Sequence, residues 1–452
     1  MDACGRPPTS KPGVTYTRDM AEVRPFRGLR YDAARVDPAV AIAPPYDVIS
    51  AAQQAALYER SPYNIVRIEY GEQRATDSAS NNRYTRAARD LGAWQREGVL
   101  GREREGAIYA YRVEFEWEGE QFARHHYFAA VRLEEWDKGI IKPHEHTLSG
   151  PKADRLDLLR ATRTQVSPVY CLYRPRQGGG SARPIKGSAL YDVAVDGQRH
   201  VLSAITDAAE IGEIAARMRD CDVYIADGHH RYETALRYRD ECRAQSSTWS
   251  GDEPENFVLM ALSDAGDPGL LVLPTHRMVN PPSVPDDRMG LLAGLFDVHD
   301  ITPACDPQLE PALGLLASAG ANSAAFIVAG LEPGRVHLLT LRDRSAGEAL
   351  MPQGQPEAWK QLDVSVLQFA ILRHVFGIDD AALAAGTAVT YSQDASAALA
   401  AVHEGRAHIA FLLNATPVGQ VLAVADASGR MPQKSTFFYP KLPTGLVMNS
   451  LA

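Results

Sequence analysis

Hydrophobic and polar residues follow each other along the chain in patterns that predict helices and strands in mixed order. Apolar residues recur at helical spacing over residues 81–97, and a glycine follows them. Residues 108–117 and 121–134 predict two antiparallel strands, because a Glu-Gly-Glu turn signal joins them. Residues 64–70 alternate apolar and polar side chains and predict another strand. We therefore expect a mixed α/β (α+β) fold.

Residues 222–236, DVYIADGHHRYETAL, carry the strongest signal for a functional site. Val223 and Ile225 belong to a short apolar run typical of a buried strand, Asp227 and Gly228 interrupt it, and helical spacing follows. The pattern predicts a strand, a tight turn and a helix. The first amides of a helix have no partner within it, and the aligned peptide dipoles attract anions to that end. This turn is therefore a candidate oxyanion site.

The side chains at this turn are suited to phosphate. His229, His230 and Arg231 stand at the opening of the predicted helix, so we expect them to bind phosphate together with the amides. Gly228 would let the backbone come close to the anion. Asp227 could cap the helix, bind Mg²⁺ or orient a histidine during catalysis. The alternative is an ordinary capped helix whose histidines face solvent.

A second candidate centre is the stretch PHEHT at residues 143–147, which follows a short apolar segment. In an extended chain, His144 and His146 point to one side and Glu145 to the other. The two histidines could bind a metal. Alternatively, Glu145 faces the cleft as a general base while His144 contacts phosphate. The stretch could also be a solvated strand end.

Other charged residues extend the candidate site on both sides. Lys152 and Arg155 could add phosphate contacts, or they are charged residues solvated at a helix start. Asp154 is placed to cap the helix that follows it. Asp47 lies on the turn PPYDVI, after which Ser50 is placed to cap a helix over residues 51–58. Asp47 is either a substrate contact or a turn carboxylate bonded to its own backbone.

Three residues in the second half of the chain could also contact substrate. His276 and Arg277 follow a strand-like apolar run, and a His-Arg pair in that position is suited to an anion. A structural salt bridge is the alternative for this pair. Lys434 precedes an aromatic cluster and could reach a phosphate from another domain.

The composition of the 452-residue chain narrows the class of protein. The chain is 45% hydrophobic and 23% charged, as in soluble globular proteins. No apolar stretch is long enough to span a bilayer, and the N-terminus lacks a signal-peptide core, so we expect a cytoplasmic protein without membrane contact. A net charge of −9 makes nucleic acid an unfavourable partner. The five scattered cysteines indicate neither a disulfide framework nor a zinc site.

Changes in composition predict three parts. Residues 1–20, rich in Pro, Gly and Thr, predict a loose tail. We expect residues 21–280 to form a catalytic core. Residues 281–452 open with a Pro-rich boundary, and we expect them to form an accessory α/β domain that contributes a C-terminal segment to the core. The sequence leaves a homodimer open.

The box DGHHR resembles the phosphate-binding box of the ParB/sulfiredoxin superfamily, in which a strand, a short polar box ending in Arg and a helix hold the phosphates of a nucleotide. More of the chain is similar to the family catalogued as domain of unknown function 1015. Its pattern is matched in order by PPYDVI, NIVRIEY, PHEHT, PKADRLDLL, DGHHRYETAL, LPTHR and MPQKSTFFYPK. The resemblance implies a ParB/sulfiredoxin-like core with a mixed sheet.

Members of this family have been linked to phosphorylation of free L-serine with pyrophosphate as donor, and the wider superfamily includes ATP- and ADP-dependent serine kinases. The resemblance therefore implies a small-molecule kinase that makes O-phosphoserine. The DGHHR turn would hold the donor phosphates, Mg²⁺ would neutralise them, and Glu145 would take the proton from the L-serine hydroxyl.

Two other classes of protein stay open. A ParB-like box can also serve as a nucleotide-operated regulatory module on DNA, although no basic stripe is present to receive DNA. A metal-dependent hydrolase would use His144, His146, His229 and His230, although the chain has no HExxH spacing.

Overall fold

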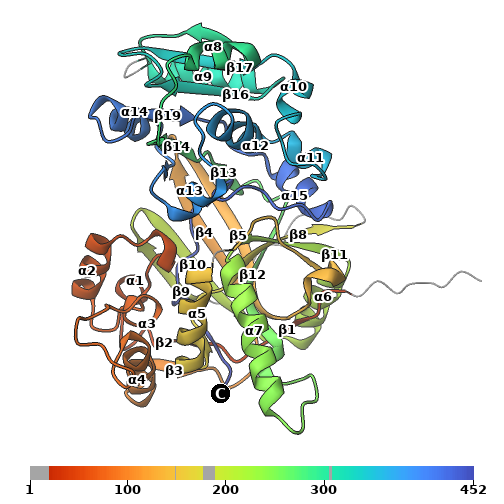
Figure 1. The fold of residues 1–452 in the computed structure, drawn as a ribbon. Coiled ribbons are helices and arrows are strands. Elements are labelled where there is room, and N and C mark those ends of the chain that lie inside the picture. The colour runs from red at the N-terminus through yellow and green to blue at the C-terminus, as the bar shows by residue number, and fades with distance from the viewer. Residues whose placement is uncertain (1–19, 148, 177–188, 305–307) are drawn as a thin grey trace, which may run out of the picture.

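A large β-sheet forms the centre of the molecule, and a smaller sheet with its own helices lies at one end of it (Figure 1). The computed structural model describes residues 20–147, 149–176, 189–304 and 308–452. Of the expected tail, residues 1–19 lie outside the described part. The two sheets and the helices around them confirm the mixed α/β class.

The larger sheet has nine strands in the order β6-β11-β8-β12-β5-β4-β10-β9, with β1 also paired to β5. Its strands are β1 (Val23–Arg24), β4 (Ile108–Trp117), β5 (Glu120–Arg132), β6 (Ile141–Lys142), β8 (Val169–Pro175), β9 (Ala189–Val195), β10 (Gln198–Ile205), β11 (Cys221–Asp227) and β12 (Phe257–Asp264). The pairs β6 with β11 and β8 with β12 are parallel, and the others are antiparallel. The predicted hairpin is confirmed as β4–β5, with its turn at Glu118 and Gly119 in left-handed backbone conformations.

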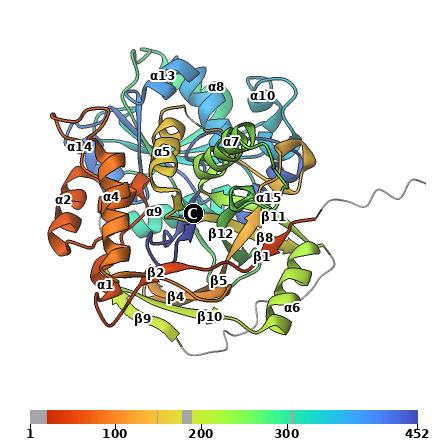
Figure 2. The ribbon, with the colours of Figure 1, turned by 90° about the horizontal axis from the view of Figure 1, so that it is seen from below.

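Helices α5 and α7 pack side by side against this sheet, whereas α2 and α4 lie together on one flank and α6 on the opposite flank (Figures 1 and 2). The helical segments of this part are α1 (Pro38–Ala41), η1 (Tyr46–Val48), α2 (Ala51–Arg60), α3 (Val66–Glu69), α4 (Arg83–Arg96), η2 (Trp136–Lys138), α5 (Ser149–Thr162), α6 (Ala208–Arg219), α7 (His229–Gln245) and η3 (Pro254–Asn256). Ser50 caps α2 through a reciprocal capping box with Gln53, as predicted.

The strand predicted over residues 64–70 is wrong, because this segment contains the helical turn α3. The Asn64 side chain donates to Val40 O at 2.8 Å and accepts from Val66 N–H at 3.0 Å. These bonds fix a turn where alternation alone predicts an extended chain. Ile65 and Val66 are both buried, so the segment has no solvent-facing side of the kind a half-buried strand requires.

The expected cap at Asp154 is also wrong, because α5 already begins at Ser149. Asp154 lies inside the helix and forms ion pairs with Arg83 and Arg155. The Tyr84 hydroxyl donates to the same carboxylate at 2.8 Å. Contacts distant in sequence therefore decide the role of this carboxylate.

The smaller sheet is antiparallel, in the order β15-β17-β16-β19-β14-β18. Its strands are β14 (His276–Val279), β15 (Phe296–Asp300), β16 (Ala325–Ala329), β17 (Val336–Leu341), β18 (Val389–Ser392) and β19 (Ile409–Leu412). The helices of this part are α8 (Arg288–Leu295), α9 (Leu309–Gly320), α10 (Arg344–Glu348), α11 (Glu357–Lys360), α12 (Asp363–Val366), the π-helical turn η4 (Leu367–Arg373), α13 (Asp380–Ala385), α14 (Ala395–His403) and α15 (Val418–Asp426). A separate hydrophobic core fills this part, with Phe326 and Phe411 fully buried.

After α15 the chain returns to the larger sheet, and its C-terminus lies there (Figure 1). Strand β20 (Phe437–Tyr439) pairs with β13 (Leu271–Leu273), and β21 (Asn449–Ser450) pairs with β7 (Thr164–Gln165). Near the N-terminus, β2 (Leu29–Tyr31) pairs with β3 (Leu100–Arg102). Arg124 is fully buried and donates to Tyr439 O and Pro440 O at 2.8 and 2.6 Å, which fixes the returning segment.

The division at residue 280 stays a proposal. Strand β14 precedes that position but pairs within the smaller sheet. Within the described ranges, none of the helices is both long and apolar enough to cross a membrane.

Candidate functional site

The turn between β11 and α7 has the predicted form of strand, tight turn and helix. Gly228 has a φ of +92° and precedes His229, the first residue of α7. A Cβ atom at Gly228 would lie 2.9 Å from the Arg231 Nε, so both backbone conformation and space favour glycine here. No side chain of the described residues caps this helix, so its first amides have no side-chain partner.

The PHEHT stretch lies directly beside this turn. Because β6 runs parallel to β11, the residues after β6 continue alongside the end of β11. The backbone N–H of His144 donates to His229 Nε2 at 3.3 Å, and the His144 Nδ1–H donates to Ile225 O at 2.7 Å. The two stretches singled out in the sequence thus form one site.

The two buried histidines of this site are neutral near pH 7. Burial lowers the pKa of His144 to about 4 and holds the pKa of His229 well below its ordinary value. The second ring nitrogen of His144 lies 3.2 Å from Thr436 Oγ1, so both of its nitrogens have protein partners. His144 therefore joins three segments of the chain, and its ring leaves no nitrogen for the predicted phosphate contact.

Asp227 is paired with a lysine that the sequence did not single out as a site residue. Lys441 Nζ lies 2.9 Å from Asp227 Oδ2, and an Arg231 nitrogen lies 3.9 Å from Oδ1. Burial alone would raise the pKa of Asp227, but Lys441 and Arg231 hold it well below its ordinary value. The available signal for Lys441 was its position at the end of MPQKSTFFYPK.

Glu145 is held by the same C-terminal segment. Its carboxylate accepts the backbone N–H of Lys434 at 2.6 Å, and Met431 N–H donates to His144 O at 2.6 Å. Burial raises the pKa of Glu145, while the Lys434 bond opposes the rise. A carboxylate with a raised pKa is a stronger base than an exposed glutamate.

The predicted substrate contacts His276 and Arg277 have structural partners. His276 is buried in the smaller sheet and accepts the Leu413 N–H at 3.2 Å. Arg277 donates to Thr275 O and to Lys434 O, the latter at 3.2 Å, and burial lowers its pKa to about 10. Glu145 therefore binds the backbone N–H of Lys434 and Arg277 binds its carbonyl, and Lys434 has a φ of +56°.

The remaining predicted residues surround the start of α7 at the surface. Lys152 Nζ lies 2.9 Å from a carboxylate oxygen of Glu233. Asp47 is exposed, and burial lowers the pKa of His230 while Glu233 and Asp47 oppose that shift. The Lys434 side chain is exposed, and its positive charge further lowers the pKa of His230. These residues together form a charged rim.

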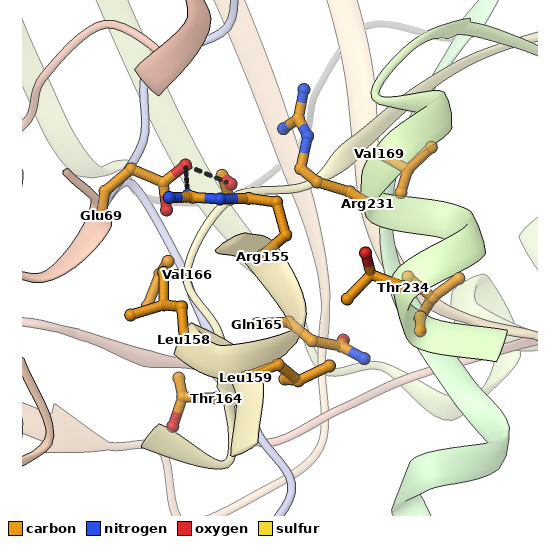
Figure 3. A pocket seen from close by; sticks show the side chains of 13 residues that line it. Glu69, Arg155, Leu158, Leu159, Thr164, Gln165, Val166, Val169, Arg231 and Thr234 are labelled. Carbon is orange, nitrogen blue, oxygen red and sulfur yellow. Dashed lines mark hydrogen bonds and ion pairs between the residues drawn. The ribbon is translucent and has the colours of Figure 1, made fainter. Parts of the chain in front are cut away.

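Figure 3 shows a buried ion pair between Glu69 and Arg155, which was not predicted. Arg155 Nη1 lies 3.2 Å from Glu69 Oε1, and its guanidinium lies 4.0 Å from the centre of the Tyr46 ring. Ser167 Oγ donates to Glu69 at 3.0 Å. Arg231 lines the same pocket and donates to Pro168 O, so its guanidinium points into the protein. The pair joins α3 to α5, and Tyr46 of the Asp47 turn lies against the Arg155 guanidinium.

The predicted Mg²⁺ ligand does not form a metal site by itself. Within the described part of the chain, no group of three or more His, Cys, Asp or Glu side chains is arranged to hold a metal ion. The carboxylate of Asp227 is already bonded to Lys441. A magnesium ion would have to take most of its oxygen ligands from a substrate and water.

The fold and the site define a mixed α/β protein in which an Asp–Lys ion pair lies at the end of β11, next to the start of α7. Residues 23–365 match the family described as "Protein of unknown function (DUF1015)", and the chain belongs to this family. The family resemblance is thereby confirmed, whereas the ParB/sulfiredoxin likeness of the core stays a prediction. No curated protein matches the chain.

Several solved structures are similar to the chain at low identity. A conserved hypothetical protein from Pyrococcus furiosus is 14% identical, with a TM-score of 0.35, over 72% of this chain and 95% of its own. A free serine kinase in complex with AMP is 13% identical, with a TM-score of 0.34, and the match covers 71% of this chain and 92% of the kinase chain. A mutant free serine kinase in complex with ADP is 12% identical, with a TM-score of 0.35, and the match again covers 71% of this chain and 92% of the kinase chain. Likenesses of this degree define no activity for this chain.

Proposed function

We propose that this protein is a small-molecule kinase that transfers a phosphoryl group to the hydroxyl of free L-serine and releases O-phosphoserine. The donor is pyrophosphate or a nucleoside phosphate such as ATP or ADP. One observation carries the proposal: the His144 backbone is bonded to His229 at 3.3 Å, so the residue after it, Glu145, lies beside the uncapped start of α7.

Donor binding rests on the backbone of the β11–α7 turn. The amides after Gly228 and the positive end of the α7 dipole would hold the phosphate oxygens. Lys441 and Lys434 add positive charge beside the turn, the first in contact with Asp227. The buried histidines are neutral and serve to fix the backbone, so charge stabilisation comes from the amides and lysines.

Glu145 is the proposed general base. As the serine oxygen forms its bond to the terminal phosphorus of the donor, the hydroxyl proton passes to the Glu145 carboxylate. The bond between that phosphorus and its bridging oxygen breaks, and the leaving phosphate or nucleotide keeps the electron pair. Phosphoryl transfer requires mainly positioning, electrostatic stabilisation and an acceptor for this proton, and the raised pKa of Glu145 suits it to the third task.

L-serine as acceptor is the inference that the family resemblance supports. Magnesium would accompany the donor phosphates as their counter-ion. A nucleotide-binding regulatory module and a metal-dependent hydrolase remain the alternatives.

The test is to incubate purified protein with isotope-labelled L-serine, Mg²⁺ and each donor in turn, and to measure labelled O-phosphoserine by mass spectrometry. We expect product with at least one donor, and none with Glu145→Gln. Glu120→Gln, an exposed glutamate in the β4–β5 hairpin, is the matched control and should retain activity. If a folded sample that binds phosphate gives no O-phosphoserine with any donor, the kinase assignment is wrong. Release of phosphate without O-phosphoserine would indicate a hydrolase.

A further inference from the structure

A pocket with a volume of about 210 Å³ is lined by Lys441, whose ammonium group is bonded to Asp227 of the candidate phosphate site. Its walls come from three segments distant in sequence. Pro44 and Val48 lie on the turn that carries Asp47, Gln198 lies at the end of the β9–β10 hairpin, and Phe437 and Tyr439 lie on the returning C-terminal segment. Two of these segments, the turn and the C-terminal segment, also border the start of α7. The pocket and the phosphate site are therefore built from shared parts of the chain.

Lys441 connects the pocket to the phosphate site. Its side chain lines the pocket, while its ammonium group lies 2.9 Å from Asp227 Oδ2. The same ammonium group lies 4.5 Å from the centre of the Phe437 ring. A phosphate bound at the α7 amides and a group seated in the pocket would be separated by about one side chain. A molecule with phosphates at one end and a ring at the other matches this arrangement.

The charges that line the pocket already have partners. Lys441 is paired with Asp227, and Asp196 lies 3.3 Å from an Arg60 nitrogen. His200 is neutral near pH 7, because burial lowers its pKa to about 4. A free amino acid, with its ammonium and carboxylate groups, would have to compete for these pairs. An uncharged occupant would leave them intact.

The uncharged lining is suited to a flat heterocycle. Phe437 and Tyr439 offer aromatic surface, and Val48 and Pro44 offer apolar contact. The side-chain amide of Gln198 can donate and accept hydrogen bonds at the edge of a ring. Stacking on aromatic side chains and hydrogen bonding at the ring edge are the usual contacts of nucleobases in proteins.

We propose that this pocket binds the nucleobase of the phosphoryl donor, which makes a nucleoside phosphate the preferred donor over pyrophosphate. The inference rests on the proposed kinase function, because it assumes that the donor phosphates lie at the start of α7. It names the donor class, which the sequence left open.

The test is calorimetric titration of the full-length protein with ADP and with pyrophosphate, which carry the same number of phosphate groups. We expect ADP to bind about 5- to 150-fold more tightly than pyrophosphate, which is the range that one stacked base contributes. Val48→Phe fills the pocket from a half-buried position and should remove most of this advantage while leaving pyrophosphate binding unchanged. Val402→Phe is the matched control, because Val402 is half-buried and lines a different cavity in the smaller-sheet part.

Gln198→Ala provides a second variant should Val48→Phe fail to fold. It trims a partly exposed side chain and should weaken ADP binding several-fold without affecting pyrophosphate. Equal binding of ADP and pyrophosphate by the native protein, or equal losses for both ligands in the variants, overturns the nucleobase pocket. O-phosphoserine formed from pyrophosphate would then leave the kinase function standing. Failure of the folded protein to bind either ligand would overturn both proposals.

Discussion

Replacement of Lys441 by methionine removes the ammonium partner of Asp227 and tests the electrostatics of the site. The two side chains are only 14% and 20% exposed, and the joined atoms are 2.9 Å apart. Removing one partner of a buried ion pair costs about 3–5 kcal/mol. This cost is reduced because Arg231 lies 3.9 Å from the same carboxylate and because both side chains keep some exposure to solvent. We therefore expect Lys441→Met to lower the free energy of unfolding by about 2–3 kcal/mol.

The pH dependence of this loss follows from Asp227. Burial would raise the pKa of Asp227, but Lys441 and Arg231 hold it below the ordinary value. The ionised carboxylate therefore contributes stability above the pKa of the unfolded chain, about 4, and loses it as the pH falls through the lower folded pKa. Without Lys441 the pKa of Asp227 rises, and protonation relieves the buried charge. The difference between native protein and variant should be largest near pH 7 and should already be smaller at pH 4, because Asp227 of the variant becomes protonated as the pH falls through its raised pKa.

The assay is urea unfolding of the native protein, Lys441→Met, Asp227→Asn and the double variant at pH 7 and pH 4. We expect a coupling energy of at least about 1.5 kcal/mol at pH 7. Lys138→Met is the control, because Lys138 is half-exposed in its pair with Glu134, and its loss should cost less than about 1 kcal/mol. A Lys441→Met loss no larger than that of the control, or a coupling near zero, refutes the reasoning.

Three further predictions concern the base, the turn and a helix cap. Glu145→Gln should lower the rate of O-phosphoserine formation about 10²–10⁴-fold in a mass-spectrometric assay. The native rate should rise with pH through the pKa of Glu145, which burial raises above its ordinary value, because the base acts unprotonated. A native rate that does not rise as the pH passes through the raised pKa of Glu145 would contradict the role of Glu145. Gly228→Ala should lower the free energy of unfolding by about 1–2 kcal/mol, because the φ of this position is +92° and the alanine Cβ would approach Arg231. An unchanged melting temperature would contradict this account. Ser50→Ala should cost about 1 kcal/mol, measured by urea unfolding, because the capping box with Gln53 is lost, whereas Ser246→Ala beyond the end of α7 should cost little.

Local signals in the sequence predicted the elements whose structure local bonds determine. The β4–β5 hairpin follows from alternating strands around a glycine turn, and α2 follows from the capping residue Ser50. The β11–α7 turn follows from an apolar run interrupted by Asp227 and Gly228. Each of these signals lies within a few residues of the structure that it specifies.

Contacts distant in sequence decided the features that the sequence did not predict. Lys441 is 214 positions from Asp227, and no local pattern marks the two as partners. The alternation over residues 64–70 predicted a strand because the side-chain bonds of Asn64 to Val40 and Ile42 are invisible to periodicity. Likewise, the sequence placed His144 in a suitable segment but could not show that both of its ring nitrogens have protein partners.

The central claim is that a phosphoryl donor binds at the first amides of α7 and faces Glu145. A crystal structure of the protein with pyrophosphate and L-serine tests it most directly. The account predicts a phosphate group on the amides after Gly228, with the serine hydroxyl within hydrogen-bond reach of the Glu145 carboxylate. Phosphate bound only elsewhere on the protein, with the start of α7 closed to it, would contradict the claim.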